Sequence, residues 1–164
     1  MYNKYMTATS HALVSGAIVA AIPDPFVSLP LVFVSHFIMD AVPHWDFGTN
    51  WRDRSKSKTG AVAILDTIVG FTVTYFVFGG KVELPLLMLA MILGNLPDWL
   101  EAPYYIFFAR QNQKAPAASA GFWELLTYKI YRIENLFHTK AEFPFGFFTQ
   151  FATVAFFLLL LRRP

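Results

Sequence analysis

Residues 26–44 read FVSLPLVFVSHFIMDAVPH, and this stretch carries the signals that decide the fold. Most of it is apolar, and its length is close to the roughly 17–25 residues that cross a bilayer as a helix. His36 and Asp40 interrupt it four residues apart, and His44 follows after four more. Residues spaced by four share one helical face. The stretch therefore predicts a membrane-spanning helix with a metal-binding edge.

Apolar blocks of similar length recur along the chain. We expect five of them to cross a membrane as helices: residues 8–22, 26–42, 59–78, 84–109 and 145–161. Pro23-Asp24-Pro25 predicts a tight turn between the first two blocks, with Asp24 as a helix cap. Pro97 and Pro103 predict a kink or a lateral exit in the fourth. We expect residues 1–164 to form a single all-α domain, a polytopic integral membrane helix bundle.

Composition supports this class of protein and excludes others. Hydrophobic residues make up 55% of the 164 residues and charged residues 15%, compared with roughly 45–50% and 25% in soluble domains. The net charge of +2 is too small to suggest a nucleic-acid partner. The chain has no cysteine, so a bound metal would need His, Asp or Glu ligands.

A further segment, residues 122–137, has an amphipathic helical pattern. Leu125, Leu126, Ile130, Ile133 and Phe137 would form one apolar stripe, which is typical of a helix lying in the headgroup region. Most lysines and arginines fall on the side of the predicted loop 44–58. By the positive-inside rule, this side and the N-terminus are predicted to be cytoplasmic.

The ionisable residues of the predicted spans gather on that same side, where charge inside a membrane normally marks function. Three pairs have helical spacing, namely His36 with Asp40, Asp98 with Glu101, and Glu134 with His138. The predicted metal ligands are His11, His36, Asp40, His44, Asp66, Asp98, Glu134 and His138. The alternative is a structural network of hydrogen bonds and ion pairs between membrane helices. An excess of carboxylates over intramembrane lysine and arginine favours bound divalent cations.

Four short motifs resemble the small inner-membrane metal-dependent hydrolases of the YdjM-like type, which are distantly related to zinc-dependent phospholipase C. They are Thr9-Ser10-His11, residues 35–46 (SHFIMDAVPHWD), Leu96-Pro97-Asp98 and Phe137-His138-Thr139. The resemblance implies hydrolysis of a phosphoester or a similar bond, and a prokaryotic inner membrane as the location. Where the family often has a His-Arg-x-x-x-His-Ser run, this chain has only His138-Thr139-Lys140.

His and carboxylate ligands without thiolate favour zinc, two or more ions, with manganese, iron or magnesium as alternatives. Such metals activate a bound water as a nucleophile. Glu101 or Asp46 would relay the proton, and Arg132, Lys140 and Arg52 would hold a lipid phosphate. The interfacial depth of the site predicts a lipid-like substrate with one apolar end. A metal-ion transporter and a non-catalytic membrane scaffold with a structural ion network are the alternative functions.

Overall fold

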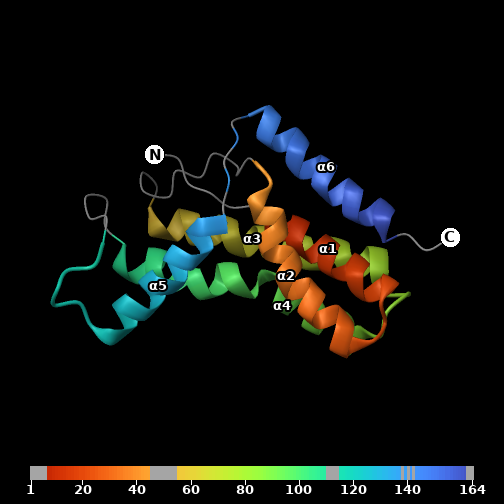
Figure 1. Cartoon of the computed structure of the whole chain (residues 1–164), viewed down its shortest axis with the longest axis horizontal. Helices are drawn as coiled ribbons and strands as arrows, with labels where there is room; N and C mark the ends of the chain where they lie inside the picture. Colours follow the sequence, from red (N-terminus) through yellow and green to blue (C-terminus); the bar gives the residue numbers. More distant parts are fainter. Residues whose placement is uncertain are drawn as a thin grey trace.

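The computed structural model describes residues 7–44, 55–109, 115–137, 139, 141 and 143–161. These residues form an all-α structure of six α-helices and one short π-helical segment, η1 (Figure 1). The elements are α1 (Ala8–Ala21), α2 (Pro25–Ala41), α3 (Lys56–Phe78), α4 (Leu84–Pro103), η1 (Tyr104–Phe108), α5 (Phe122–Phe137) and α6 (Phe145–Leu160). The expected helices are all present, and α3 begins three residues before the predicted block.

Helices α1 and α2 form the expected hairpin around Pro23-Asp24-Pro25. Asp24 is the N-cap of α2, and its carboxylate accepts a hydrogen bond from the Phe26 amide at 2.9 Å. Thr7 caps α1 in the same way, with its side chain accepting from the Ser10 amide at 3.3 Å. Short polar side chains at these positions satisfy amides that have no partner within the helix. The expected cap at Asp24 is confirmed.

Helix α1 lies at the centre of the bundle and packs against α2, α3, α4 and α6. Small residues allow its close approach to α3. A Cβ atom at Gly70 would lie 2.6 Å from the Cα atom of Thr9, and one at Gly16 would lie 2.6 Å from the Phe78 ring. Packing through small residues is the usual way in which membrane helices approach closely. This contact places the first turn of α1, which carries His11, against the middle of α3.

Helix α3 extends well beyond the start of α1. Asp66, which accepts a hydrogen bond from the Ala8 amide at 2.6 Å, lies ten residues after Lys56. About 15 Å of α3 therefore precedes its contact with the start of α1. The end of α4 extends to the same side, where α5 packs against α4 and η1 (Figure 1). The start of α1 thus lies part-way along the two longest helices.

The α-helical part of α4 includes both prolines at which the sequence predicts a kink or an exit. The α-helix continues through Pro97 to Pro103 and then changes to the π-helical turn η1. A proline has no amide hydrogen, so it removes the helical donor to the carbonyl four residues before it. Neighbouring helices in a bundle tolerate this loss. Asp98 and Glu101 therefore lie on the same helix as the residues before Pro97.

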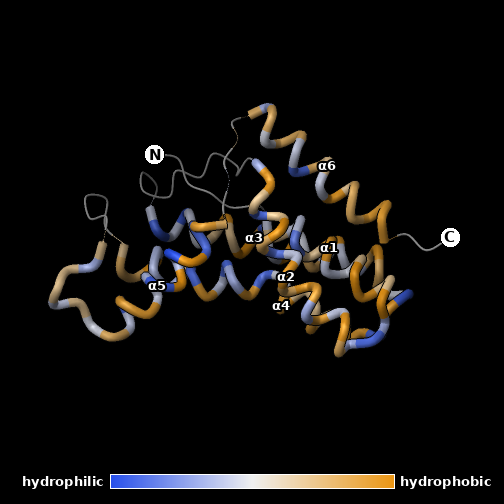
Figure 2. Tube along the Cα trace, in the orientation of Figure 1, coloured by the Kyte–Doolittle hydropathy of each residue, from blue (hydrophilic) through white to orange (hydrophobic). Residues whose placement is uncertain are grey.

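Apolar side chains cover the outside of the bundle, while polar ones lie inside it. Figure 2 shows hydrophobic residues along α2, α4 and α6. Phe26, Phe76 and Phe151 are 90%, 80% and 69% exposed, whereas His11, His36 and Asp40 are buried. Helix α3, and α4 together with η1, are long and apolar enough to cross a membrane by length and composition; α1, α2 and α6 are apolar but shorter.

Helix α5 has the predicted bounds, but it packs through its polar side. Its buried residues are Thr127 and Glu134, whereas Leu125, Ile133 and Phe137 of the predicted apolar stripe are exposed. Tyr131 stacks on Tyr104 of η1 with ring centroids 4.9 Å apart. The tyrosine contact fixes α5 against the end of α4. Glu134 therefore points into the bundle, and the apolar stripe faces outward.

Candidate metal centre

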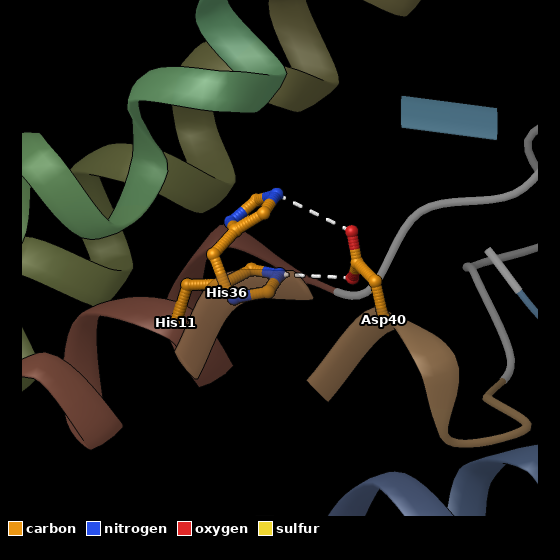
Figure 3. A group of neighbouring side chains, drawn as sticks. All are labelled: His11, His36 and Asp40. Atoms are coloured by element: carbon orange, nitrogen blue, oxygen red, sulfur yellow. Dashed lines mark ion pairs between the residues drawn. The ribbon is translucent and has the colours of Figure 1, made fainter. Parts of the chain in front are cut away.

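Three buried side chains from the α1–α2 hairpin converge at the start of α1 (Figure 3). Nε2 of His11 lies 3.3 Å from Oδ1 of Asp40, and Nε2 of His36 lies 3.3 Å from Oδ2 of the same carboxylate. One ligand atom from each residue lies within 4.8 Å of the others. This separation allows a single ion to contact all three. The structure therefore contains a group that could hold a metal ion, made of His11, His36 and Asp40.

The orientation of His36 is fixed by the backbone of α4. Its Nδ1–H donates a hydrogen bond to the Gly94 carbonyl at 2.8 Å. With the proton on Nδ1, Nε2 keeps the lone pair that a metal ligand needs. Metal-binding histidines usually donate their second ring nitrogen to a carbonyl or carboxylate in this way. Gly94 permits the approach, because a Cβ atom there would overlap the Ser15 hydroxyl of α1.

His11 supplies the second imidazole from the first turn of α1. Its ring stacks on that of His36, with centroids 4.1 Å apart and planes at 25°. Within the described part of the chain, Nδ1 of His11 has no hydrogen-bond partner, while Nε2 faces the Asp40 carboxylate at 3.3 Å. A buried polar atom without a partner is costly. Nε2 is the atom of His11 that could coordinate an ion together with Asp40.

Two more carboxylates approach the same nitrogen of His36. Oδ1 of Asp98 lies 3.9 Å from Nε2, and Oε2 of Glu134 lies 3.8 Å from it. Together with Asp40, three carboxylates lie within 3.9 Å of one imidazole nitrogen. Mutual repulsion of such groups is offset by a bound cation, which is the largest local charge in a metal site. Asp98 and Glu134 can therefore add to the ligand set or orient it.

Glu101, on the same helix as Asp98, has a different partner. It is fully buried, and the Tyr105 hydroxyl donates a hydrogen bond to its Oε1. Tyr105 also packs edge-on against Tyr131 of α5. Glu101 is not part of the group formed by His11, His36 and Asp40. Its contact links the carboxylate to the tyrosine cluster that holds α5 in place.

Asp66 and His44 also lie outside that group of three. Both oxygens of Asp66 accept hydrogen bonds from the start of α1: the Ala8 amide donates to Oδ2 at 2.6 Å, and the Thr9 hydroxyl to Oδ1 at 2.7 Å. His44 donates from Nδ1 to the Val42 carbonyl at 2.8 Å, and its backbone pairs with Thr139. Each of these residues supports an element that carries a member of the group.

Four predicted residues lie outside the described part of the chain: Asp46, Arg52, His138 and Lys140. Arg132 is described and is exposed on α5. It lies two residues from the buried Glu134, and residues two apart do not share a helix face. The structure therefore brings His11, His36, Asp40, Asp98 and Glu134 together and leaves Arg132 on another side of α5.

Sequence reasoning missed the Gly94 carbonyl, because no side-chain pattern identifies a main-chain acceptor. A signal was present in Gly94-Asn95-Leu96-Pro97-Asp98, where a small residue and a proline adjoin a candidate ligand. Glycine allows close helix packing, and proline perturbs the carbonyls of the preceding turn. This combination could have indicated a backbone contact to another helix.

The donor set limits the kinds of metal ion that the site could hold. Two imidazole nitrogens and one carboxylate, with a remaining position for water, are the ligands of open catalytic zinc sites. The same three donors also suit iron(II). Comparison of the chain with family models, curated proteins and solved structures finds no match. The geometry of the site therefore has to support any functional proposal by itself.

Proposed function

We propose that this protein is an integral-membrane metal-dependent hydrolase that cleaves a phosphoester bond of a lipid or lipid-like substrate with a metal-activated water. One observation carries the proposal. The Gly94 carbonyl holds His36 so that its Nε2 faces the Asp40 carboxylate, which His11 also approaches. A bound ion would be shared by the two imidazole nitrogens and the carboxylate, whereas a structural network would place a proton between His36 and Asp40. The short motifs that resemble the YdjM-like hydrolases suggested the class of reaction, and the geometry of the site is what supports it.

The proposed metal is zinc, held by His11, His36 and Asp40. The carboxylates of Asp98 and Glu134 both lie near Nε2 of His36. They would provide ligands for a second ion. When bound, zinc lowers the pKa of a coordinated water and polarises a phosphoryl oxygen. The protein side chains bind the ion, exclude bulk water and set the position of the reacting phosphate.

Glu101 is the proposed proton acceptor among the described residues. The Tyr105 hydroxyl donates to one of its oxygens, which holds the carboxylate in a fixed orientation within the bundle. A general base must be positioned within reach of the water that it deprotonates, directly or through one further water. Asp46 as an alternative base, and Arg52 and Lys140 as phosphate contacts, stay predictions.

A membrane location is part of the proposal. The outward faces of α2, α3 and α6 are rich in exposed Phe, Leu, Ile and Val, and soluble proteins rarely expose contiguous apolar patches larger than a few hundred Å². We propose that α1, α2 and α6 cross the membrane with α3 and α4, which gives five spans. The exposed apolar stripe of α5 would then lie at the interface. The predicted orientation places the N-terminus on the cytoplasmic side of a prokaryotic inner membrane.

Elemental analysis of detergent-solubilised protein tests the metal site directly. The wild type is expected to retain at least one zinc per chain after dialysis, and His36→Ala and Asp40→Ala are expected to lose it. Hydrolysis would then be measured with dioleoyl phosphatidic acid and dioleoyl phosphatidylglycerol, by mass spectrometry of the products. Sub-stoichiometric metal after repletion, with unchanged variants, would overturn the hydrolase proposal and favour a structural network.

A further inference from the structure

A cavity of about 170 Å³ lies between the first turns of α3 and the end of α4. It reaches the contact between α3 and the start of α1, since Ala8 and Asp66 also line it. Its walls are mainly apolar and include Val62 and Ala63 on one side and Trp99, Ala102 and Ile106 on the other. Val62, Trp99 and Ile106 are also exposed on the outside of the bundle. The cavity therefore opens toward the apolar outer surface.

The cavity is connected to the metal centre through Asp98. This residue lines the cavity, and its Oδ1 lies 3.9 Å from Nε2 of His36. Its side chain is 18% exposed, whereas those of Asp40 and Glu134 are 0% and 5% exposed. Asp98 is thus the most accessible carboxylate around His36. A molecule in the cavity would reach the metal centre along this side chain.

The chemistry of the walls defines the kind of molecule that fits. Apolar cavities of about 150 Å³ stay dry and bind ligands the size of benzene. A cavity of about 170 Å³ therefore suits a short segment of an alkyl chain, while the rest of a longer chain would remain at the apolar outer surface. The polar end of such a molecule would lie beside Asp98 and His36.

We propose that this cavity binds the part of an alkyl chain nearest the phosphate of a single-chain or multi-chain phosphorylated amphiphile. The assignment rests on the proposed function, because it places the phosphate at the metal centre. It adds a direction of entry: the substrate arrives from the side, between α3 and α4, with its chain still in contact with the apolar surface of the bundle.

A second hollow of about 560 Å³, between α1, α3 and α6, is the competing location for the chain. None of the residues around His36 lines it. Its polar residues bond to one another: Gln150 donates to the Thr7 and Ser10 hydroxyls at 2.6 and 2.9 Å. The two cavities share Thr7, Val62 and Asp66, but Val69 lines only the second one and therefore provides a matched control.

Binding of two phosphates to zinc-loaded, detergent-solubilised protein tests the assignment by calorimetry. Ala63→Phe and Ala102→Phe fill the cavity from opposite walls, and Val69→Phe enlarges a residue that lines the second hollow. Both cavity variants are expected to weaken hexadecyl phosphate at least about tenfold, since lost contact with two methylenes suffices for this change. Ethyl phosphate affinity and zinc content should stay unchanged, and Val69→Phe should bind both phosphates as the wild type does.

The results separate the two proposals. Equal wild-type affinity for hexadecyl and ethyl phosphate, or unchanged hexadecyl phosphate binding in both cavity variants, would overturn the cavity assignment. If only Val69→Phe weakened hexadecyl phosphate binding, the alkyl chain would be assigned to the second hollow, and this result would also overturn the cavity assignment. Chain-length-dependent binding that is sensitive to Ala63→Phe and Ala102→Phe in a protein that holds no zinc would support the cavity and overturn the hydrolase.

Discussion

Two carboxylates in the apolar helices, Asp40 of α2 and Asp66 of α3, lie in contrasting surroundings. Asp40 is fully buried and faces Nε2 of both His11 and His36 at 3.3 Å. Asp66 is half-buried and accepts hydrogen bonds from the Ala8 amide and the Thr9 hydroxyl. One carboxylate faces groups that can share a metal ion with it, and the other faces hydrogen-bond donors.

The difference shows what an acidic residue in an apolar helix needs in order to be a metal ligand. A carboxylate among N–H and O–H donors already has the partners that offset its burial. A carboxylate between imidazole nitrogens can be satisfied by protonated histidine or by a cation. Asp66 in addition stabilises the positive end of the α1 dipole. We therefore expect substitution of Asp40 to reduce zinc binding, and substitution of Asp66 to reduce stability without loss of zinc.

The largest effect is expected for Asp40→Asn, which keeps the size of the side chain and removes its charge. Zinc affinity should fall by more than about 100-fold, because the loss of a direct ligand exceeds the 10–100-fold cost of losing a supporting contact. Competition with a chelator measures the affinity. Asp66→Asn serves as the control and should keep its zinc. Equal zinc affinity in Asp40→Asn and Asp66→Asn would show that Asp40 is no more a metal ligand than Asp66 is.

Gly94→Ala should have the next largest effect, because the added methyl group would overlap the Ser15 hydroxyl and displace the carbonyl that orients His36. Zinc affinity should fall about 10–100-fold. Gly60→Ala, where the added atom meets open space, should leave it unchanged. Adding Ser15→Gly to Gly94→Ala should restore part of the affinity. Failure of this rescue would show that the contact with Ser15 does not limit the site.

Asp66→Ala should lower stability while leaving the metal in place. It removes the acceptor for the Ala8 amide and the Thr9 hydroxyl, and hydrogen bonds to charged groups contribute about 1.5–3 kcal/mol. We expect the free energy of unfolding to fall by about 2 kcal/mol, measured by denaturant titration in detergent, with unchanged zinc per chain. Loss of zinc from folded Asp66→Ala protein would assign this carboxylate to the metal centre.

The smallest effect is expected for Asp24→Ala, at the opposite end of the hairpin. Asp24 caps α2 through one hydrogen bond to the Phe26 amide, and loss of an N-cap costs about 1 kcal/mol. The same denaturant titration should therefore show about half the loss seen for Asp66→Ala, and zinc content should not change. If Asp24→Ala lowered the free energy of unfolding more than Asp66→Ala does, the number of hydrogen bonds that each carboxylate accepts would not explain the loss of stability.

The helices were predictable from sequence because their boundaries are chemically marked. Proline and Asp24 delimit the first two helices, and the observed α1 and α2 begin and end within one residue of the predicted blocks. Leu84 and Phe145 begin the helices that the apolar pattern predicted. How many of these helices cross a membrane is a separate question: α3, and α4 with η1, have the necessary length and composition, and the five-span topology stays a prediction.

The site was only partly predictable, because spacing places residues on a helix face but does not identify their partners. The separation of His36 and Asp40 by four residues correctly placed both on one edge of α2. The same reasoning could not separate Asp66 from the metal-binding carboxylates. Its hydrogen-bond partners, Ala8 and Thr9, lie far away in the sequence. The pattern of α5 predicted its apolar stripe but did not identify Thr127 and Glu134 as the residues that the helix buries against the bundle.

The hydrogen bond from His36 to the Gly94 carbonyl has a consequence for protein engineering. Because its acceptor belongs to the main chain, the hydrogen bond does not depend on the side chain of a partner residue, and the His36 ring is expected to keep its orientation as long as position 94 stays glycine. His11 has no such hydrogen bond within the described residues. An attempt to reprogram metal preference should therefore start at position 11, where the ligand type can be exchanged against a fixed reference ring.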